Sequence, residues 1–218
     1  MDKMVNVEFW KDKKVFVTGH TGFKGSWLVQ ILKNFGAKVC GYSLEPNTSP
    51  NLFEIAKISE GIEHNIGDVR DFENMFKVFN DFQPDIVLHL AAQPIVLTSY
   101  QEPKYTYETN VMGTVNILEC IRLTNCVKSF VNVTTDKVYK NMEDAVAFDE
   151  SMPLDGYDPY SNSKSCSELV THSYRASFFG NRDTAISTVR SKATATPSKT
   201  FLSHRPTTPR RTQGCSVS

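Results

Sequence analysis

Residues 19–25 read Gly19-His20-Thr21-Gly22-Phe23-Lys24-Gly25, and this stretch decides the predicted fold. It directly follows the apolar run Val15-Phe16-Val17 and directly precedes residues 26–32, whose apolar spacing is helical. A strand that turns through three glycines into a helix can hold the pyrophosphate of a dinucleotide. Glycine permits the tight turn, the close approach of backbone to phosphate and the packing of helix against strand. The helix N-terminus adds free N–H groups and a partial positive charge. The stretch therefore predicts a dinucleotide-binding loop.

Composition places the chain among ordinary globular proteins. It has 218 residues, of which 40% are hydrophobic, and no apolar run is long enough for a membrane span of about 20 residues. Residues 191–218 contain five Lys or Arg residues and no Asp or Glu, so the remainder is mildly acidic and gives no reason to expect nucleic-acid binding. Cysteines are odd in number, without a CxxC pair, which predicts a cytoplasmic protein with neither disulfides nor a metal site. They are Cys40, Cys120, Cys126, Cys166 and Cys215.

Strand-like and helix-like segments alternate along the chain. The apolar patterns predict strands at 15–18, 37–43, 62–66, 86–90, 130–134 and 185–189, and helices at 24–35, 71–82, 105–123 and 158–179. Strands that are apolar on both faces and separated by helices imply a parallel sheet covered on both sides. We therefore expect an α/β fold with a doubly wound parallel sheet, a Rossmann-type dinucleotide-binding and catalytic domain that occupies residues 1–190.

Tyr160 and Lys164 are the first candidate catalytic pair. Four residues apart, they lie on one face of a helix that begins at the expected N-cap Asp158, with Pro159 in the first position. An ammonium near a phenol favours the phenolate, which lowers the pKa of the tyrosine toward that of a general base. Tyr100 has a lysine at the same spacing, but Pro103 between them argues against a continuous helix, so we interpret that pair as chance.

Thr135, Asp136 and Lys137 follow the predicted fifth strand. A hydroxyl, a carboxylate and an amine in succession at a strand's carboxyl end suit a catalytic cluster, whereas a polar exit from the strand is the alternative interpretation. The glycine loop and the Tyr160 pair favour the catalytic one.

Other candidate cofactor-binding residues follow the third and fourth strands. Asp71 is the better cap for the next helix, which leaves Asp68 free to accept hydrogen bonds from an adenine amino group. Small residues after the fourth strand let the cofactor lie close to the backbone, whereas His89 is expected to be a core residue. The second strand ends without a decisive acid or arginine, so NAD is favoured only modestly over NADP. The predicted cofactor-binding residues are Gly19, Thr21, Gly22, Phe23, Lys24, Gly25, Asp68, Val69, Leu90, Ala91, Ala92, Gln93, Tyr160 and Lys164.

Together these motifs resemble the extended short-chain dehydrogenase/reductases that act on nucleotide sugars. The resemblance covers about residues 8–190 and is closest to the CDP-glucose 4,6-dehydratases, in which lysine replaces the glutamate found after Thr-Asp in dTDP-glucose enzymes; this chain has Lys137 there. It rests on residues 18–28 (TGHTGFKGSWL), 91–94 (AAQP), 99–103 (SYQEP), 109–114 (TNVMGT) and 156–164 (GYDPYSNSK).

The resemblance implies a reaction, a cofactor and a partner. Tyr160, assisted by Lys164 and Thr135, would take the proton of the 4-hydroxyl of CDP-glucose while hydride moves from C4 to NAD. Asp136 and Lys137 would then assist loss of water across C5–C6, and which of them is the acid and which the base is left open. A lysine base needs a lowered pKa, which burial beside Lys164 would provide for Lys137. It also implies a hydro-lyase of lipopolysaccharide deoxysugar synthesis and a homodimer through the two long helices. Another nucleotide-sugar dehydratase or epimerase, or an inactive NAD-binding fragment, are the alternatives.

Two departures from the family pattern bear on this interpretation. Leu97 stands where relatives usually have arginine. After Arg190 the family's continuation is replaced by a Ser/Thr-rich segment, for which we expect a truncated or frameshifted reading frame, a missing substrate lobe and a disordered tail over 191–218. These expectations predict weakened cofactor binding and little turnover.

Overall fold

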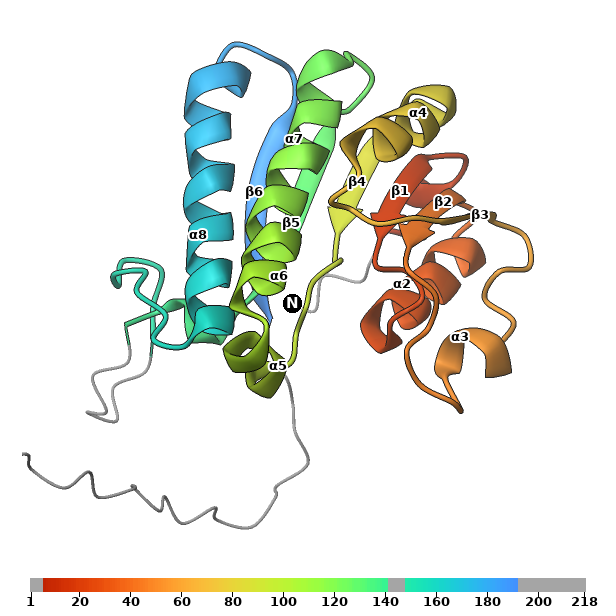
Figure 1. The fold of residues 1–218 in the computed structure, drawn as a ribbon. Coiled ribbons are helices and arrows are strands. Elements are labelled where there is room, and N and C mark those ends of the chain that lie inside the picture. Colours follow the sequence, from red (N-terminus) through yellow and green to blue (C-terminus); the bar gives the residue numbers. More distant parts are fainter. Residues whose placement is uncertain (1–5, 141–147, 192–218) are drawn as a thin grey trace, which may run out of the picture.

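The computed structural model describes residues 6–140 and 148–191 (Figure 1). Six strands form one sheet with the order β3-β2-β1-β4-β5-β6, and every neighbouring pair is parallel. The strands are β1 Lys14–Thr18, β2 Lys38–Ser43, β3 Glu63–Ile66, β4 Ile86–His89, β5 Ser129–Thr135 and β6 Ala185–Ser191. The doubly wound parallel fold predicted from the sequence is confirmed, with strand ends displaced by no more than two residues.

Helices cover both faces of the sheet (Figure 1). Alternation along β1 builds both cores, because Phe16 packs with α4, α7 and η3 on one face while Val15 and Val17 pack with α2 and α3 on the other. The helices are α1 Val7–Trp10, α2 Phe23–Asn34, α3 Leu52–Ile55, α4 Phe72–Phe82, α5 Val96–Gln101, α6 Pro103–Tyr107, α7 Gly113–Leu123 and α8 Pro159–Tyr174. The π-helical η1 Glu108–Met112 and η3 Arg175–Phe179 and the 3₁₀ turn η2 Asp136–Val138 complete the set.

The long helix predicted over 105–123 is present but differs in two ways. It begins at Pro103, the first residue of α6, since proline suits a first helical turn whose N–H groups have no partner. It also contains the π-helical turn η1, which joins α6 to α7. Tyr100 lies in the separate helix α5, so its pairing with Lys104 is chance, as predicted.

The strand order has a switch point between β1 and β4. β1 lies between β2 and β4, and Thr18 is in register with both Tyr42 and His89. The connection after β1 runs toward β2 and the connection after β4 runs the other way, toward β5, so the loops after β1 and β4 diverge and open a crevice at their carboxyl ends. The predictions for residues 192–218 and for Cys215 lie outside the described residues.

Candidate functional site

A cleft of about 640 Å³ lies at the carboxyl ends of the strands, as the strand order predicts. Its lining includes all fourteen residues predicted to bind the cofactor, among them the glycine loop and both members of the Tyr160–Lys164 pair. The structure therefore brings together side chains separated by more than 140 positions of sequence.

The glycine loop is packed against the loop that follows β4. Gly19 has φ +74°, a conformation that side chains other than glycine rarely adopt, and a Cβ atom there would lie 2.7 Å from the backbone nitrogen of Ala91. At Gly25 a Cβ atom would overlap the carbonyl oxygen of Gly19. Gly22 is the N-cap of α2, and a Cβ there would approach only the Gly19 oxygen, at 3.4 Å. The first and third glycines thus serve chain packing, whereas the second keeps the helix N-terminus bare toward the cleft.

His89 joins the first and fourth strands to the helix layer. Its Nδ1 lies 2.7 Å from Thr18 Oγ1, which also accepts hydrogen bonds from the backbone N–H groups of Leu90 and Ala91. Its Nε2 lies 3.3 Å from Thr114 Oγ1. Burial, and to a lesser degree the charge of Lys164, lower the pKa of His89 to about 3. His89 is a neutral core residue, as predicted.

Asp68 lines the cleft, and its carboxylate is already paired within the chain. Its carboxylate accepts hydrogen bonds from the backbone N, Nε and Nη2 of Arg70 at 2.9, 2.9 and 2.6 Å. Burial alone would raise the pKa of Asp68, but the bonds from Arg70 lower it below its usual value. Asp71 caps α4 as predicted, its side chain accepting from the N–H of Asn74. The sequence separated the two aspartates correctly and missed Arg70, whose guanidinium also lies 4.8 Å from the ring of Tyr105.

The loop after β2 forms one wall of the cleft. The sequence did not show decisively which cofactor this loop favours. Thr21 Oγ1 lies 2.9 Å from Ser43 Oγ and donates to the carbonyl of Leu44, which fixes this loop to the glycine loop. The residues 43–47 all line the cleft, and Glu45 is the acidic member among them. Their position at the carboxyl end of β2 was the sequence feature that could have predicted them as cleft residues.

Helix α8 carries Tyr160 and Lys164 into the cleft. Asp158 caps it, accepting from the N–H of Ser161 at 3.0 Å and from its hydroxyl at 2.6 Å, and Pro159 opens the first turn. Lys164 is 3% exposed, and its Nζ donates to the carbonyl of Val133 at 3.4 Å. Burial lowers the pKa of Lys164 to about 8, although Glu168 acts in the opposite direction. Lys164 is therefore a buried amine whose pKa lies close to neutral pH.

The expected effect on Tyr160 is wrong for this structure. Burial raises the pKa of the Tyr160 phenol, and the hydrogen bond with Thr135 only partly opposes it. Asp158 and Asp136 raise it further, because each negative charge disfavours a phenolate. The pKa of Tyr160 is therefore raised although Lys164 lies one turn away on α8.

Thr135, Asp136 and Lys137 form the end of β5 and the turn η2. Thr135 donates to Asp136 Oδ1 at 3.1 Å and accepts from the N–H of Lys137 at 3.4 Å. None of the three lines the NAD cleft, but Thr135 is buried in contact with Tyr160, whereas Asp136 is half-buried and Lys137 is exposed. The burial expected for Lys137 beside Lys164 is therefore wrong.

Asn110 is a site residue that the sequence reasoning missed. Within η1, its fully buried amide accepts from the N–H of Gln93 at 2.8 Å and donates to the Gln93 carbonyl and to Ser163 Oγ. It thus ties the loop after β4 to the helix that carries Lys164. The motif at 109–114 was the available signal, since it is one of the segments that carry the resemblance.

The described segments, 6–140 and 148–191, offer neither a membrane span nor a cluster of metal ligands. None of their helices has the length and apolar character needed to cross a membrane, and none of their His, Cys, Asp and Glu side chains gather in threes able to hold a metal ion.

Comparisons with known proteins find relatives that are named as sugar-nucleotide dehydratases and epimerases. The family model for GDP-mannose 4,6 dehydratase matches residues 16–190. A CDP-glucose 4,6-dehydratase of Salmonella typhimurium is 52% identical over 176 residues, which are 81% of this chain and 49% of that protein. A GDP-mannose 4,6-dehydratase of Yersinia enterocolitica is 29% identical, over 76% of this chain and 46% of its own.

Solved structures give the same picture. A UDP-glucose 4-epimerase of Thermus thermophilus in complex with NAD has a TM-score of 0.67 at 29% identity, covering 76% of this chain and 52% of its own. A dTDP-glucose 4,6-dehydratase of Bacillus anthracis in complex with NAD has a TM-score of 0.65 at 25% identity, covering 77% and 52%. The chain thus spans about half the length of the relatives that it matches.

Proposed function

Since the chain belongs to the GDP-mannose 4,6 dehydratase family, we propose that it binds NAD and supplies the catalytic residues that convert CDP-glucose to CDP-4-keto-6-deoxyglucose and water. The observation that carries the proposal is the single cleft lined by the glycine loop, Tyr160 and Lys164. CDP-glucose is chosen because the relative with that substrate in its name is 52% identical, compared with 29% for a GDP-mannose enzyme.

The residues of the cleft fit NAD. The bare N-cap at Gly22 and the buried Gly25 leave the first turn of α2 open to a pyrophosphate. Asp68 and Val69 are proposed to hold the adenosine part, and residues 90–93 the central part of the cofactor. The loop after β2 offers Glu45 and no basic side chain to the cleft, which supports NAD over NADP.

The proposed reaction uses two groups of side chains. When bound, NAD would supply a hydride acceptor at C4 and, in its reduced form, the hydride donor for C6. Tyr160 accepts the proton of the 4-hydroxyl, and the Lys164 ammonium and the Thr135 hydroxyl stabilise the phenolate that this step requires. The raised pKa of Tyr160 opposes that phenolate, so the positive charge of Lys164 is essential to the step.

Asp136 and Lys137 are proposed to assist the second step. The 4-keto group acidifies the C5 proton, one side chain takes that proton, and the other donates a proton to the departing 6-hydroxyl, so that one water leaves. A proton then returns to C5 from the side chain that took it, as C6 receives the hydride. The exposure of Lys137 leaves its ammonium free to meet a substrate that lies outside the NAD cleft.

The wider context of the proposal follows from the sequence motifs and the resemblance that they carry. Residues 1–190 form its dinucleotide-binding and catalytic unit, which works in the cytoplasm in deoxysugar synthesis for lipopolysaccharide. A homodimer through α7 and α8 is supported by exposed apolar side chains on or beside these helices, Met112, Leu123, Leu169 and Phe178. Two alternatives remain: an epimerase of the same family, supported by the UDP-glucose 4-epimerase neighbour, and an NAD-binding protein without turnover.

One preparation tests the proposal and its alternatives. Calorimetry measures NAD binding, mass spectrometry follows loss of one water from CDP-glucose, and size-exclusion chromatography gives the oligomeric state. We expect NAD to bind weakly, and product to form slowly from CDP-glucose in preference to UDP-glucose and dTDP-glucose. The Tyr160→Phe variant should bind NAD within about threefold of the wild type but form no product. Binding without product from any sugar favours the non-catalytic alternative, a 4-epimer favours the epimerase, and absence of NAD binding refutes the proposal.

A further inference from the structure

Glu168 is a buried carboxylate that the proposed reaction does not use. It lies on α8 one turn beyond Lys164, and the two residues are 4% and 3% exposed. Burying a carboxylate is costly unless hydrogen bonds and an opposite charge compensate it. Its surroundings therefore show what holds it there.

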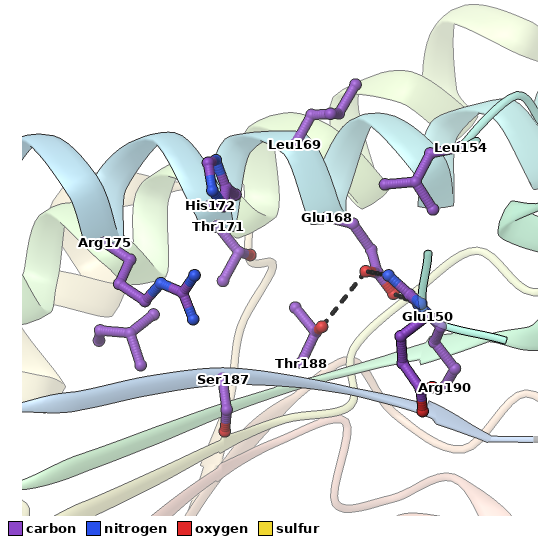
Figure 2. A pocket seen from close by; sticks show the side chains of 11 residues that line it. Glu150, Leu154, Glu168, Leu169, Thr171, His172, Arg175, Ser187, Thr188 and Arg190 are labelled. Atoms are coloured by element: carbon purple, nitrogen blue, oxygen red, sulfur yellow. Dashed lines mark hydrogen bonds and ion pairs between the residues drawn. The ribbon is translucent and has the colours of Figure 1, made fainter. Parts of the chain in front are cut away.

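Three side chains from two strands hold the Glu168 carboxylate, and Figure 2 shows two of them, Thr188 and Arg190. Oε1 accepts from Thr134 Oγ1 at 2.5 Å and from Arg190 Nε at 2.9 Å. Oε2 accepts from Arg190 Nη2 at 2.6 Å and from Thr188 Oγ1 at 3.2 Å. Four donors with a two-pronged guanidinium contact are the partners of an ionised carboxylate. Glu168 thus ties α8 to both β5 and β6.

The same contacts connect Glu168 to the cofactor cleft. Thr134 lines that cleft, and the carbonyl of the preceding residue, Val133, accepts the hydrogen bond from Lys164. On its other side, Glu168 lines a second cavity of about 500 Å³ between α8 and β6, together with Thr188 and Arg190 (Figure 2). Glu168 therefore fixes the strand segment against which the Lys164 ammonium rests.

The charges around Lys164 leave Glu168 as its counter-charge. His89 on β4 is neutral, and Tyr160 on α8 is a phenol whose pKa is raised. Across the described residues, no carboxylate forms an ion pair with Lys164, and Glu168 is the one group found to raise its pKa against the effect of burial. Arg190 shares the carboxylate, but its side chain is 19% exposed toward the second cavity, so solvent screens its charge better than that of Lys164.

We propose that Glu168 is a positioning residue of the site: it clamps Thr134 and Arg190 between α8 and the sheet and keeps the buried Lys164 ammonium in its charged form. The proposal rests on the proposed function only in treating Lys164 as part of the cofactor site.

Selective ¹³C labelling of lysine tests the proposal without cofactor. The Cε resonance of Lys164, assigned with Lys164→Met, reports the ammonium directly during a pH titration. Glu168→Gln removes the charge and keeps the shape, so we expect the pKa of Lys164 to fall from about 8 by roughly one pH unit or more. Glu168→Asp keeps the charge and should restore most of the wild-type value. Glu150→Gln, at an exposed residue lining the same second cavity, should leave the titration unchanged.

A second variant covers the case in which Glu168→Gln does not fold. Arg190→Gln removes the competing positive charge, so the pKa of Lys164 should rise. An unchanged Lys164 titration in a folded Glu168→Gln or Arg190→Gln protein overturns the proposal. Because these readouts need neither NAD nor sugar, they separate failure of this proposal from failure of the proposed function.

Discussion

Gly19 carries the strictest steric requirement among the residues of the site. Its backbone has a positive φ, and the chain of the loop after β4 lies where a side chain would begin. Gly36 has nearly the same φ, +77°, but the nearest atom to its Cβ position is 3.7 Å away. The two glycines therefore separate backbone strain from crowding.

We expect Gly19→Ala to lower the free energy of unfolding by roughly 2–4 kcal/mol, since left-handed strain and overpacking add. Gly36→Ala should cost about 1 kcal/mol, from strain alone. Urea unfolding measures both, and calorimetry should show loss of NAD affinity only for Gly19→Ala. Equal losses of stability in the two variants would contradict the role given to the Ala91 contact.

At the scale of elements, α8 links the folding of the sheet to the chemistry of the cleft. Its N-cap lies two residues before Tyr160, so the capping contacts of Asp158 set where the phenol enters the cleft. Asp71 makes the same kind of cap on α4, in the loop after β3, with one hydrogen bond to the N–H of Asn74. A cap that orders a site residue differs in function, though not in local energy, from one that only begins a helix.

Asp158→Ala and Asp71→Ala should each lower the free energy of unfolding by about 1 kcal/mol, the usual cost of an N-cap. Only Asp158→Ala should speed hydrogen exchange of the first turn of α8 and slow any proton transfer that depends on Tyr160. Exchange mass spectrometry and urea unfolding check the pair. Unaltered exchange at residues 159–162 in Asp158→Ala would show that packing alone holds the turn.

At the scale of the whole molecule, two buried histidines of the described residues have a pKa far below the usual value. His20 is buried in the glycine loop with its Nε2 2.7 Å from His64 Nδ1, and burial, then the charge of His64, lower its pKa to about 4. His89 is buried beneath the cleft with a pKa of about 3. An unfolded histidine titrates near 6.5, so between these values the unfolded chain binds more protons than the folded one. Stability therefore rises with pH through this window and is lost as pH falls.

As pH falls from 6.5 to 5, the unfolding free energy lost to each of the two histidines should rise toward a limit of about 1.4 kcal/mol per pH unit. Urea unfolding at pH 7, 6 and 5 measures this slope. His89→Gln should reduce it by about half. A stability that stays constant over this range would mean that both histidines protonate without cost in the folded protein.

The sequence by itself determined the order of strands and helices, the glycine loop, both N-caps and the face of α8 that carries Tyr160 and Lys164. These depend on local periodicity, on glycine and proline, and on spacings of a few residues, which act before the chain is folded. Only the tertiary structure decided that Arg70 takes Asp68, that Asn110 joins the loop after β4 to α8, and that Glu168 is shared by Thr134 and Arg190. It also decided that Lys164 is buried while Lys137 is exposed. Partners distant in sequence and the depth of burial set the pKa values and pairing of these side chains, and both depend on how the helices pack against the sheet.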